Sequence, residues 1–343
     1  MTHAPVEKGV RLDFPFPIML CDIGGTNARF ALKSAPGAPL LPGPPIKTAD
    51  YSCFEAALST AFVGFAVKPR SVIACAAGPI SGRSAKLTNA AWEIDGAAIA
   101  RELSLDQGLL LNDFEAQALT LPVLEHDWTT HIGPPVEAAP GVRLVIGVGT
   151  GLGAAALVEV EGRYLALASE AGHVDFAPVG AVEAAIWPHI RMSDQGRISA
   201  ETILSGHGIA RLHQARCAAA GLPPPTLDEI GVVREALAAP DGEEARTLGL
   251  FWVLVARCAG DLTLNLLAKG GVIFSGGVLP RLTAFLDPAQ FRARFEDKAP
   301  FGEMMQQIGT RLVIANEVVL PGLAAIAVDP DRYIIDYAAR AWR

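Results

Sequence analysis

Two short stretches of this chain place a threonine among glycines between runs of apolar residues. They are "DIGGTNARFAL", residues 22–32, and "GVGTGLGAAAL", residues 147–157. Glycines let backbone N–H groups converge on an anion, and a threonine hydroxyl adds a further donor. The pattern predicts two phosphate-binding turns, with plain structural turns as the alternative. The residues concerned are Gly24, Gly25, Thr26, Gly149, Thr150 and Gly151.

A carboxylate stands directly before the first of these turns. Asp22 is separated from the glycine pair by one apolar residue. A carboxylate beside bound phosphates is a typical ligand of Mg²⁺, either directly or through water. Asp22 is therefore a candidate magnesium ligand, and the alternative is an aspartate that caps the turn.

A second carboxylate lies where an apolar run gives way to a helical pattern. In "LLLNDFEAQAL", residues 109–119, Asn112 and Asp113 occupy that corner. Corners at which a strand feeds a helix face the ligand crevices of α/β folds. Asp113 is thus a candidate for chemistry on a ligand. The competing interpretation is that Asp113 is the N-cap of the helix.

Polar residues also gather in "SEAGHVDFAP", residues 169–178, and at the start of "ISAETILSG", residues 198–206. Glu170 and His173 suit a ligand with several hydroxyl groups, because a carboxylate accepts hydrogen bonds and an imidazole can donate one. A metal site is the alternative, but no other His or Cys lies at ligand spacing. Asp175 can equally be structural. Glu201 is either a further ligand-binding residue or a favourable charge at a helix start.

Glycine pairs bracket one further apolar run, "KGGVIFSGGVLPR", residues 269–281. Gly276 and Gly277 would let a flat nucleotide base and its ribose approach the backbone, and tight packing is the alternative. A nicotinamide cofactor is also an alternative, because "GTGLGA" matches the dinucleotide fingerprint. That fingerprint requires a helix after the glycines. The alternating residues from Val158 to Glu161 predict a hairpin instead.

The elements that must position these residues alternate between strands and helices, which predicts an α/β fold. A strand–turn–strand is expected over 16–35 and a Pro-rich surface connection over 36–51. Helices are expected over 53–65, 92–105 and 113–121, and buried strands over 71–78 and 108–112. A second strand series begins at residue 142. The remainder is expected to be helical apart from one strand within 270–278, with an interhelix loop over 217–231.

Bulk properties exclude several classes of protein. The chain has 343 residues, of which 51% are hydrophobic and 19% charged, with a formal net charge of -8. This is a globular composition without the basic surface that nucleic acid or an anionic membrane requires. The apolar run 248–256 is too short to span a bilayer, and the N-terminal residues show no secretory pattern. Five scattered cysteines favour reduced thiols and a cytoplasmic location.

The ordered set of motifs resembles the bacterial glucokinases of the hexokinase/actin-like ATPase superfamily. The stretches that carry the resemblance are "DIGGTNARFAL", "LTNAAWEI", "NDFEAQA", "GVGTGLGAA", "EAGHVDFAP", "SAETILSG", "GGVIFSGGVLPR" and "FRARFEDK". It implies ATP-dependent phosphorylation of D-glucose at the 6-hydroxyl. Asp113 then resembles the general base, and Asp22 the Mg²⁺ ligand at the ATP phosphates. The implied glucose ligands are Asn112, Asp113, Glu170, His173 and Glu201, and the implied ATP ligands are Asp22, the two turns, Gly276 and Gly277.

The resemblance also implies a two-domain, ribonuclease H-like fold with a cleft between a small and a large α/β domain. The small domain is expected over 1–122, completed by a C-terminal helix over 322–343, and the large domain over 123–321. A cytoplasmic homodimer is expected. The chain lacks the cysteine-rich zinc motif of the related repressor and kinase family. A sugar-binding transcriptional regulator on the same scaffold is the non-enzyme alternative.

Overall fold

The computed structural model describes residues 13–87, 92–192, 196–223 and 225–342, so part of "LTNAAWEI" lies outside the described residues. The chain divides into two compact units. Unit 1 comprises Met1–Leu124, Glu159–Ala166 and Asn316–Arg343. Unit 2 comprises Glu125–Val158 and Leu167–Ala315.

Unit 1 is built on a mixed sheet whose strand order is β16-β9-β5-β1-β2-β3, with β4 also paired to β2. The strands are β1 (Ile18–Ile23), β2 (Asn27–Lys33), β3 (Leu40–Pro42), β4 (Ile46–Lys47), β5 (Ser71–Ala76), β9 (Gln107–Asn112) and β16 (Ala341–Trp342). Its helices are α1 (Phe54–Val63), α2 (Gly96–Leu103), α3 (Asp113–Thr120), α11 (Val319–Val328) and α12 (Tyr337–Arg340). A small separate sheet holds β6 (Ile80–Ser81), β7 (Ser84–Lys86) and β8 (Glu93–Asp95).

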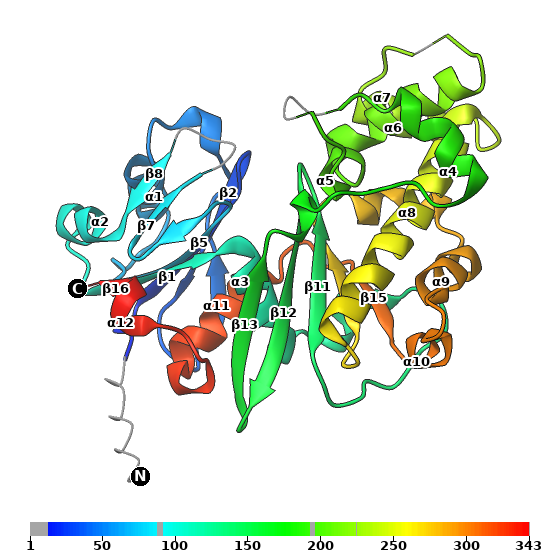
Figure 1. Ribbon diagram of the computed structural model, residues 1–343. Coiled ribbons are helices and arrows are strands. Elements are labelled where there is room, and N and C mark those ends of the chain that lie inside the picture. The colour runs from blue at the N-terminus through cyan, green and yellow to red at the C-terminus, as the bar shows by residue number, and fades with distance from the viewer. Residues whose placement is uncertain (1–12, 88–91, 193–195, 224, 343) are drawn as a thin grey trace. The chain divides into compact units, whose positions relative to one another are not determined.

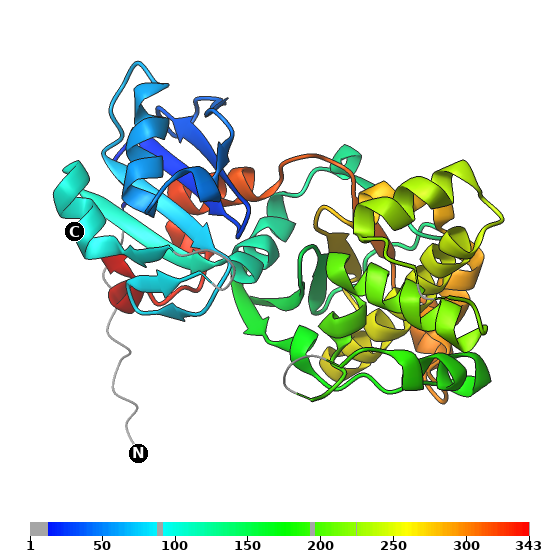
Figure 2. The same cartoon turned by 90° about the horizontal axis from the view of Figure 1, so that it is seen from above.

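Unit 2 contains a second sheet with the order β10-β15-β14-β11-β12-β13. The strands are β10 (Thr129–His131), β11 (Arg143–Val148), β12 (Leu152–Val160), β13 (Arg163–Ser169), β14 (Val272–Ser275) and β15 (Thr310–Val313). The helices are α4 (Gly180–Ile186), α5 (Ala200–Ile203), α6 (Gly206–Ala219), α7 (Glu229–Ala238), α8 (Glu243–Leu266), α9 (Pro288–Glu296) and α10 (Gly302–Gln306). The helices between residues 180 and 266, green to yellow in Figure 2, lie together in this unit.

The two sheets share one arrangement of strands. In unit 1, β1 pairs antiparallel with β2 and parallel with β5, which pairs parallel with β9. In unit 2, β11 pairs antiparallel with β12 and parallel with β14, which pairs parallel with β15. The first glycine turn joins β1 to β2, and the second joins β11 to β12 (Figure 1). The two similar glycine–threonine stretches, residues 22–32 and 147–157, therefore lie in a repeated structural motif.

Helix α8 forms the centre of unit 2. It packs against α6, α7 and α9, and Trp252 and Phe251 are buried on it. By length and composition alone α8 could cross a membrane, but 72% of its apolar window is buried inside the structure. Its charged Arg257 is 6% exposed, lies 3.2 Å from the Glu183 carboxylate and stacks on the Phe176 ring. Helix α8 thus packs as the core helix of a globular unit.

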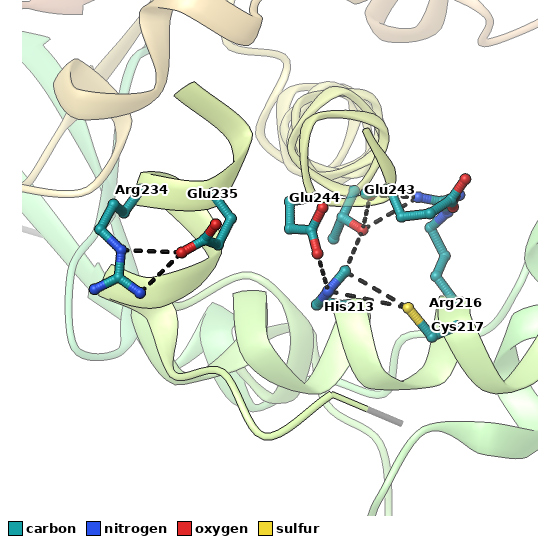
Figure 3. Close-up of polar contacts among 8 residues, drawn as sticks. His213, Arg216, Cys217, Arg234, Glu235, Glu243 and Glu244 are labelled. Carbon is teal, nitrogen blue, oxygen red and sulfur yellow. Dashed lines mark hydrogen bonds and ion pairs between the residues drawn. The ribbon is translucent and has the colours of Figure 1, made fainter. Parts of the chain in front are cut away.

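A buried polar cluster joins α6 to α8 (Figure 3). His213 is 1% exposed, and its Nε2 lies 3.3 Å from Glu244 Oε1. Its Nδ1 lies 3.0 Å from Thr247 Oγ1, and Cys217 Sγ is 3.9 Å from the ring. Burial lowers the pKa of His213, and the neighbouring Glu244 opposes that effect. His213 thus has partners on both α6 and α8.

Four expectations about elements need correction. The C-terminal segment is not one helix over 322–343, because Pro330 ends α11 and the chain continues through α12 to β16. The expected helix over 92–105 begins only at Gly96, where Asp95 caps α2 and β8 precedes it. Residues 36–51 contain the edge strands β3 and β4, positions at which proline is tolerated. The short strands β10 and β15 were not expected, since three or four residues carry little periodic signal.

The tip of the β12–β13 hairpin, Glu159–Ala166, groups with unit 1, although the expected large domain over 123–321 includes it. Tyr164 forms a strand bridge with Tyr333 and accepts a hydrogen bond from Ile334 N at its carbonyl oxygen. The Arg332 guanidinium also lies over the Tyr164 ring. These contacts join the hairpin tip to the C-terminal segment.

Candidate functional site

The first glycine turn joins β1 to β2 and is held from outside by Thr48. Gly24 N donates to Asn27 O at 2.9 Å, which closes the turn. Thr48 Oγ1 donates to Gly25 O at 2.6 Å, and Thr48 N donates to Thr26 O at 3.1 Å. Thr26 itself is exposed. The carbonyl groups of the turn are thus engaged on the side of Thr48, and the turn has a fixed shape.

Asp22 lies on β1 beside this turn with its side chain 17% exposed. Arg29 Nη1 donates to Asp22 Oδ2 at 3.2 Å, and Cys75 Sγ lies 3.5 Å from Oδ1. Burial raises the pKa of Asp22, and the Arg29 charge acts against that effect. The carboxylate has one cationic neighbour at close range, and the nearby Glu317 carboxylate adds negative charge, so a further cation such as Mg²⁺ would be electrostatically favourable there.

Asn112, not Asp113, is the N-cap of α3. Its Oδ1 accepts hydrogen bonds from Phe114 N and Glu115 N at 3.0 and 3.2 Å. Glu115 Oε2 accepts from Asn112 N in return, which completes a capping box. Asp113 is the first residue of the helix. The interpretation of Asp113 as a capping residue is therefore wrong, and its carboxylate does not form the cap.

The Asp113 carboxyl has an unusual titration. Its pKa is raised to about 7, first because burial disfavours the charged form and second because the Asp22 charge lies nearby. Hydrogen bonds from Asn112 Nδ2 and nearby backbone N–H groups oppose the shift. A carboxyl with such a pKa can take up a proton near neutral pH, as a general base must.

The second glycine turn lies in unit 2 and is held by two other elements. Gly149 O accepts from Gly206 N, the first residue of α6, at 2.8 Å. Glu201 Oε2 accepts from Leu152 N at 2.9 Å, and a Cβ on Gly151 would lie 2.3 Å from that oxygen. Glu201 is thus more than a favourable charge at the start of a helix, because its carboxylate accepts a hydrogen bond from the backbone of the turn.

The remaining predicted residues of unit 2 differ in exposure and in partners. The side chains of Glu170 and His173 are 84% and 53% exposed, with Glu170 Oε2 and His173 Nε2 3.9 Å apart. Asp175 accepts a hydrogen bond from Arg197 at 3.0 Å, in line with a structural role. Gly172 between them packs against Leu152 O, which leaves no room for a side chain.

The glycine pair after β14 approaches the second turn. Gly276 has a φ of +91°, and a Cβ on it would lie 2.3 Å from Val148 O, at the end of β11. Val278 N also donates to that oxygen. Gly277 has no atom within 4 Å of an ideal Cβ and is exposed. The backbone therefore requires glycine at position 276, whereas position 277 has room for a side chain.

The predicted residues fall into two groups, one in each unit. Asp22, Asn112, Asp113 and the first turn belong to unit 1. Glu170, His173, Glu201, the second turn and the pair Gly276–Gly277 belong to unit 2. Within the described residues, no three His, Cys, Asp or Glu side chains gather as a metal site. A magnesium ion bound through substrate phosphates needs only one or two protein carboxylates, so Asp22 still fits that role.

Comparison with known proteins decides the family. The glucokinase family model matches residues 19–330. The chain belongs to the glucokinase family. A glucokinase of Brucella suis biovar 1 is 38% identical over 331 residues, covering 96% of each chain. A glucokinase of Rhizobium meliloti is 40% identical over 332 residues, covering 96% of this chain and 97% of the relative.

Solved structures agree with this membership. A glucokinase from an Antarctic psychrotroph shares 31% identity with a TM-score of 0.80, covering 92% of this chain and all of the other. A Balamuthia mandrillaris glucokinase in complex with glucose shares 22% identity and has a TM-score of 0.76, covering 90% of this chain and 93% of the other. The expected actin-like ATPase fold of the glucokinase family is confirmed.

The fold excludes the dinucleotide-binding alternative. Strand β12 begins at Leu152, directly after Gly151, and continues through the Glu161–Gly162 turn into β13. The helix that would place its N-terminus against a pyrophosphate is replaced by the predicted hairpin. The second turn of this glucokinase-family chain is therefore not a Rossmann fingerprint.

One acidic residue near Asp22 escaped the sequence analysis. Glu317 Oε1 accepts from Val319 N and Leu320 N at the start of α11, and Glu317 Oε2 lies 3.5 Å from Arg29 Nε. Burial and the Asp22 charge raise the pKa of Glu317. An acidic residue just before the apolar helix of "NEVVLPGLAAIA" was the available signal for the cap. Its place near Asp22 depends on tertiary packing.

Proposed function

We propose that this glucokinase-family protein transfers the γ-phosphoryl group of ATP to the 6-hydroxyl of D-glucose, with Asp113 as the general base. In the reaction the Asp113 carboxylate takes the proton of the 6-hydroxyl. The freed oxygen forms a bond to the γ-phosphorus, and the bond from that phosphorus to the ADP oxygen breaks. The family model and relatives over nearly the whole chain establish glucokinase activity; the residue roles are our proposal.

One observation carries the assignment of Asp113. The helix N-cap is supplied by Asn112, so a half-buried carboxyl with a pKa raised to about 7 sits at a strand-to-helix corner without a capping role. An ordinary aspartate is fully ionised at neutral pH and is a weak base. The raised pKa makes Asp113 a better proton acceptor at the pH at which the enzyme works.

We assign the other residues by the same family resemblance and by their chemistry. By the resemblance, glucose hydroxyls would be held by Asn112, Glu170, His173 and Glu201. The carboxylates and the imidazole supply acceptors and donors. The Asn112 amide is already bonded to Asp113, Gly78 and the first N–H groups of α3, so Asn112 would have to exchange one of these bonds for a sugar hydroxyl. The ATP phosphates would be bound by the two glycine turns, and the adenosine by Gly276 and Gly277. The Streptomyces griseus relative, a ROK family glucokinase, was solved with glucose and AMPPNP, which supports ATP as the phosphoryl donor.

Mg²⁺ would be held at Asp22 together with the phosphates. When bound, it neutralises phosphate charge that develops during transfer. Asp22 is paired with Arg29, and Mg²⁺ would share or replace this partner. Full activity in excess chelator would contradict the proposal. We also propose a cytoplasmic homodimer from the resemblance, and light scattering at micromolar concentration tests the dimer.

The decisive experiment replaces Asp113 by Asn. This change keeps the size of the side chain but removes its ability to accept the proton, so kcat should fall by roughly 10²-fold or more. Glucose binding measured by calorimetry should change much less. Asp175→Asn, at an exposed carboxylate paired with Arg197, is the matched control and should keep the parental kcat. An Asp113→Asn variant that binds glucose and turns over at the parental rate would refute the proposed base.

A further inference from the structure

The C-terminal segment contacts the strand that leads to Asp113. Strand β16 pairs antiparallel with β9, with Trp342 opposite Gly108. Trp342 is 1% exposed, and a Cβ on Gly108 would lie 2.3 Å from its indole ring. Because the pairing is antiparallel, the residues just before β16 lie toward the end of β9 that carries Asn112. The labels β16 and α12 mark this segment, drawn in red in Figure 1.

Arg340, at the end of α12, forms an ion pair with Glu115 on α3. Its Nη1 lies 2.6 Å from both Oε1 and Oε2 of Glu115. The Glu115 side chain is 10% exposed and that of Arg340 30%. Glu115 is the capping-box residue that also accepts from Asn112 N at 3.3 Å. One carboxylate therefore links the C-terminal segment to the backbone of the helix cap.

The cap residue in turn holds the Asp113 carboxyl. Asn112 Nδ2 donates to Asp113 Oδ1 at 3.0 Å and to Gly78 O at 3.2 Å. Its Oδ1 accepts from the first N–H groups of α3, as described above. Rotation of the Asn112 amide would lose bonds at both ends, so the position of this residue fixes one oxygen of Asp113.

We propose that Arg340 is a positioning residue for Asp113, acting through Glu115 and Asn112. This inference rests on the proposed role of Asp113 as general base. Without Arg340 the nearly buried Glu115 carboxylate keeps, among the described residues, only the long hydrogen bond from Asn112 N, and its best position is then closer to water. A Glu115 that turns outward leaves the capping box and releases Asn112. Displacement of a reacting group by about 1 Å can cost 10²-fold in rate.

Two variants of Arg340 test the link in the full-length protein. Arg340→Met removes the cation and should lower kcat by roughly 10–100-fold with an unchanged KM for ATP. Arg340→Lys keeps the charge and should recover part of the loss. Arg332→Met is the matched control, because Arg332 lies in the same C-terminal segment and contacts Tyr164 instead of Glu115. It should keep the parental kcat. If Arg340→Met does not fold, Glu115→Gln tests the same link.

A double-mutant cycle that combines Arg340→Met with Asp113→Asn separates a positioning role of Arg340 from a general structural effect. If Arg340 acts through Asp113, Arg340→Met should lower kcat in the parent and leave the residual rate of Asp113→Asn unchanged. Equal losses in both backgrounds, or no loss in the parent, would overturn the inference. The Asp113→Asn variant alone reports on the proposed base. Failure of that proposal is therefore visible without reference to Arg340.

Discussion

Replacing Asp113 by Asn should make unit 1 more stable above neutral pH while it removes activity. The pKa of Asp113 is raised from 3.8 to about 7 in the folded protein. Between these values the unfolded chain has lost the proton and the folded chain retains it. The stabilising contribution of the protonated form is therefore complete below pH 4, and it is lost as the pH rises through about 7. Asn cannot ionise and escapes this loss.

The size of the effect follows from the difference between the two pKa values. About three pKa units at about 1.36 kcal/mol each give up to about 4 kcal/mol in favour of Asp113→Asn at pH 8. At pH 5 the folded carboxyl is still protonated, and the advantage shrinks to about 2 kcal/mol. The partial exposure of Asp113 reduces both figures, because water reaches the carboxyl. The increase in the free energy of unfolding of Asp113→Asn over the parent should nevertheless be clearly larger at pH 8 than at pH 5.

Urea unfolding at pH 5 and pH 8 without ligands measures this difference. Hydrogen exchange of peptides from β5 and β9 reports on unit 1 rather than on the whole chain. Asp50→Asn, an exposed position in the same unit, controls for the loss of one negative charge and should change the free energy of unfolding little. The reasoning is refuted if Asp113→Asn is no more stable than the parent at pH 8, or gains as much at pH 5.

Two further predictions concern unit 2. Gly276→Ala should lower the thermal midpoint and raise the KM for ATP, because its Cβ would collide with Val148 O at a φ of +91°; Gly277→Ala, measured alongside it, should keep the parental midpoint. His213, whose pKa is lowered by burial, should make unit 2 less stable as the pH falls below about 6.5. His213→Gln should weaken that acid dependence in urea unfolding, whereas His207→Gln at an exposed site should not.

Local patterns predicted the glycine hairpins and the buried strands between them. The alternation after Gly151 was enough to replace a Rossmann helix by the observed β12–β13 hairpin. The alternative interpretation of Asp113 as the cap is wrong, because Asn112 forms the cap, and Asn and Asp cap helices about equally well. The spacing from Asn112 to Glu115 contained the missing signal, because a cap residue is often paired with Glu three positions later.

Other parts of the site depend on contacts that no local pattern encodes. Arg340 and Glu115 are 225 positions apart, and Glu317 reaches the surroundings of Asp22 only through α11. The raised pKa of Asp113 likewise arises from burial and from the charge of a residue on another strand. The sequence could name candidate residues for the chemistry, but the contacts among them are seen only in the folded chain.

The pairing of β16 with β9 also bears on the order in which the protein is made. A ribosome releases β9 long before β16 and α11, and unit 2 is synthesised between them. Until β16 arrives, β9 presents an unpaired edge to other chains, which is a known route to aggregation. The nascent chain therefore needs protection on its first unit while its second unit folds. Arg340, which supports Asp113, is added only after unit 2, so we expect catalytic competence to arise only after β16 has been synthesised.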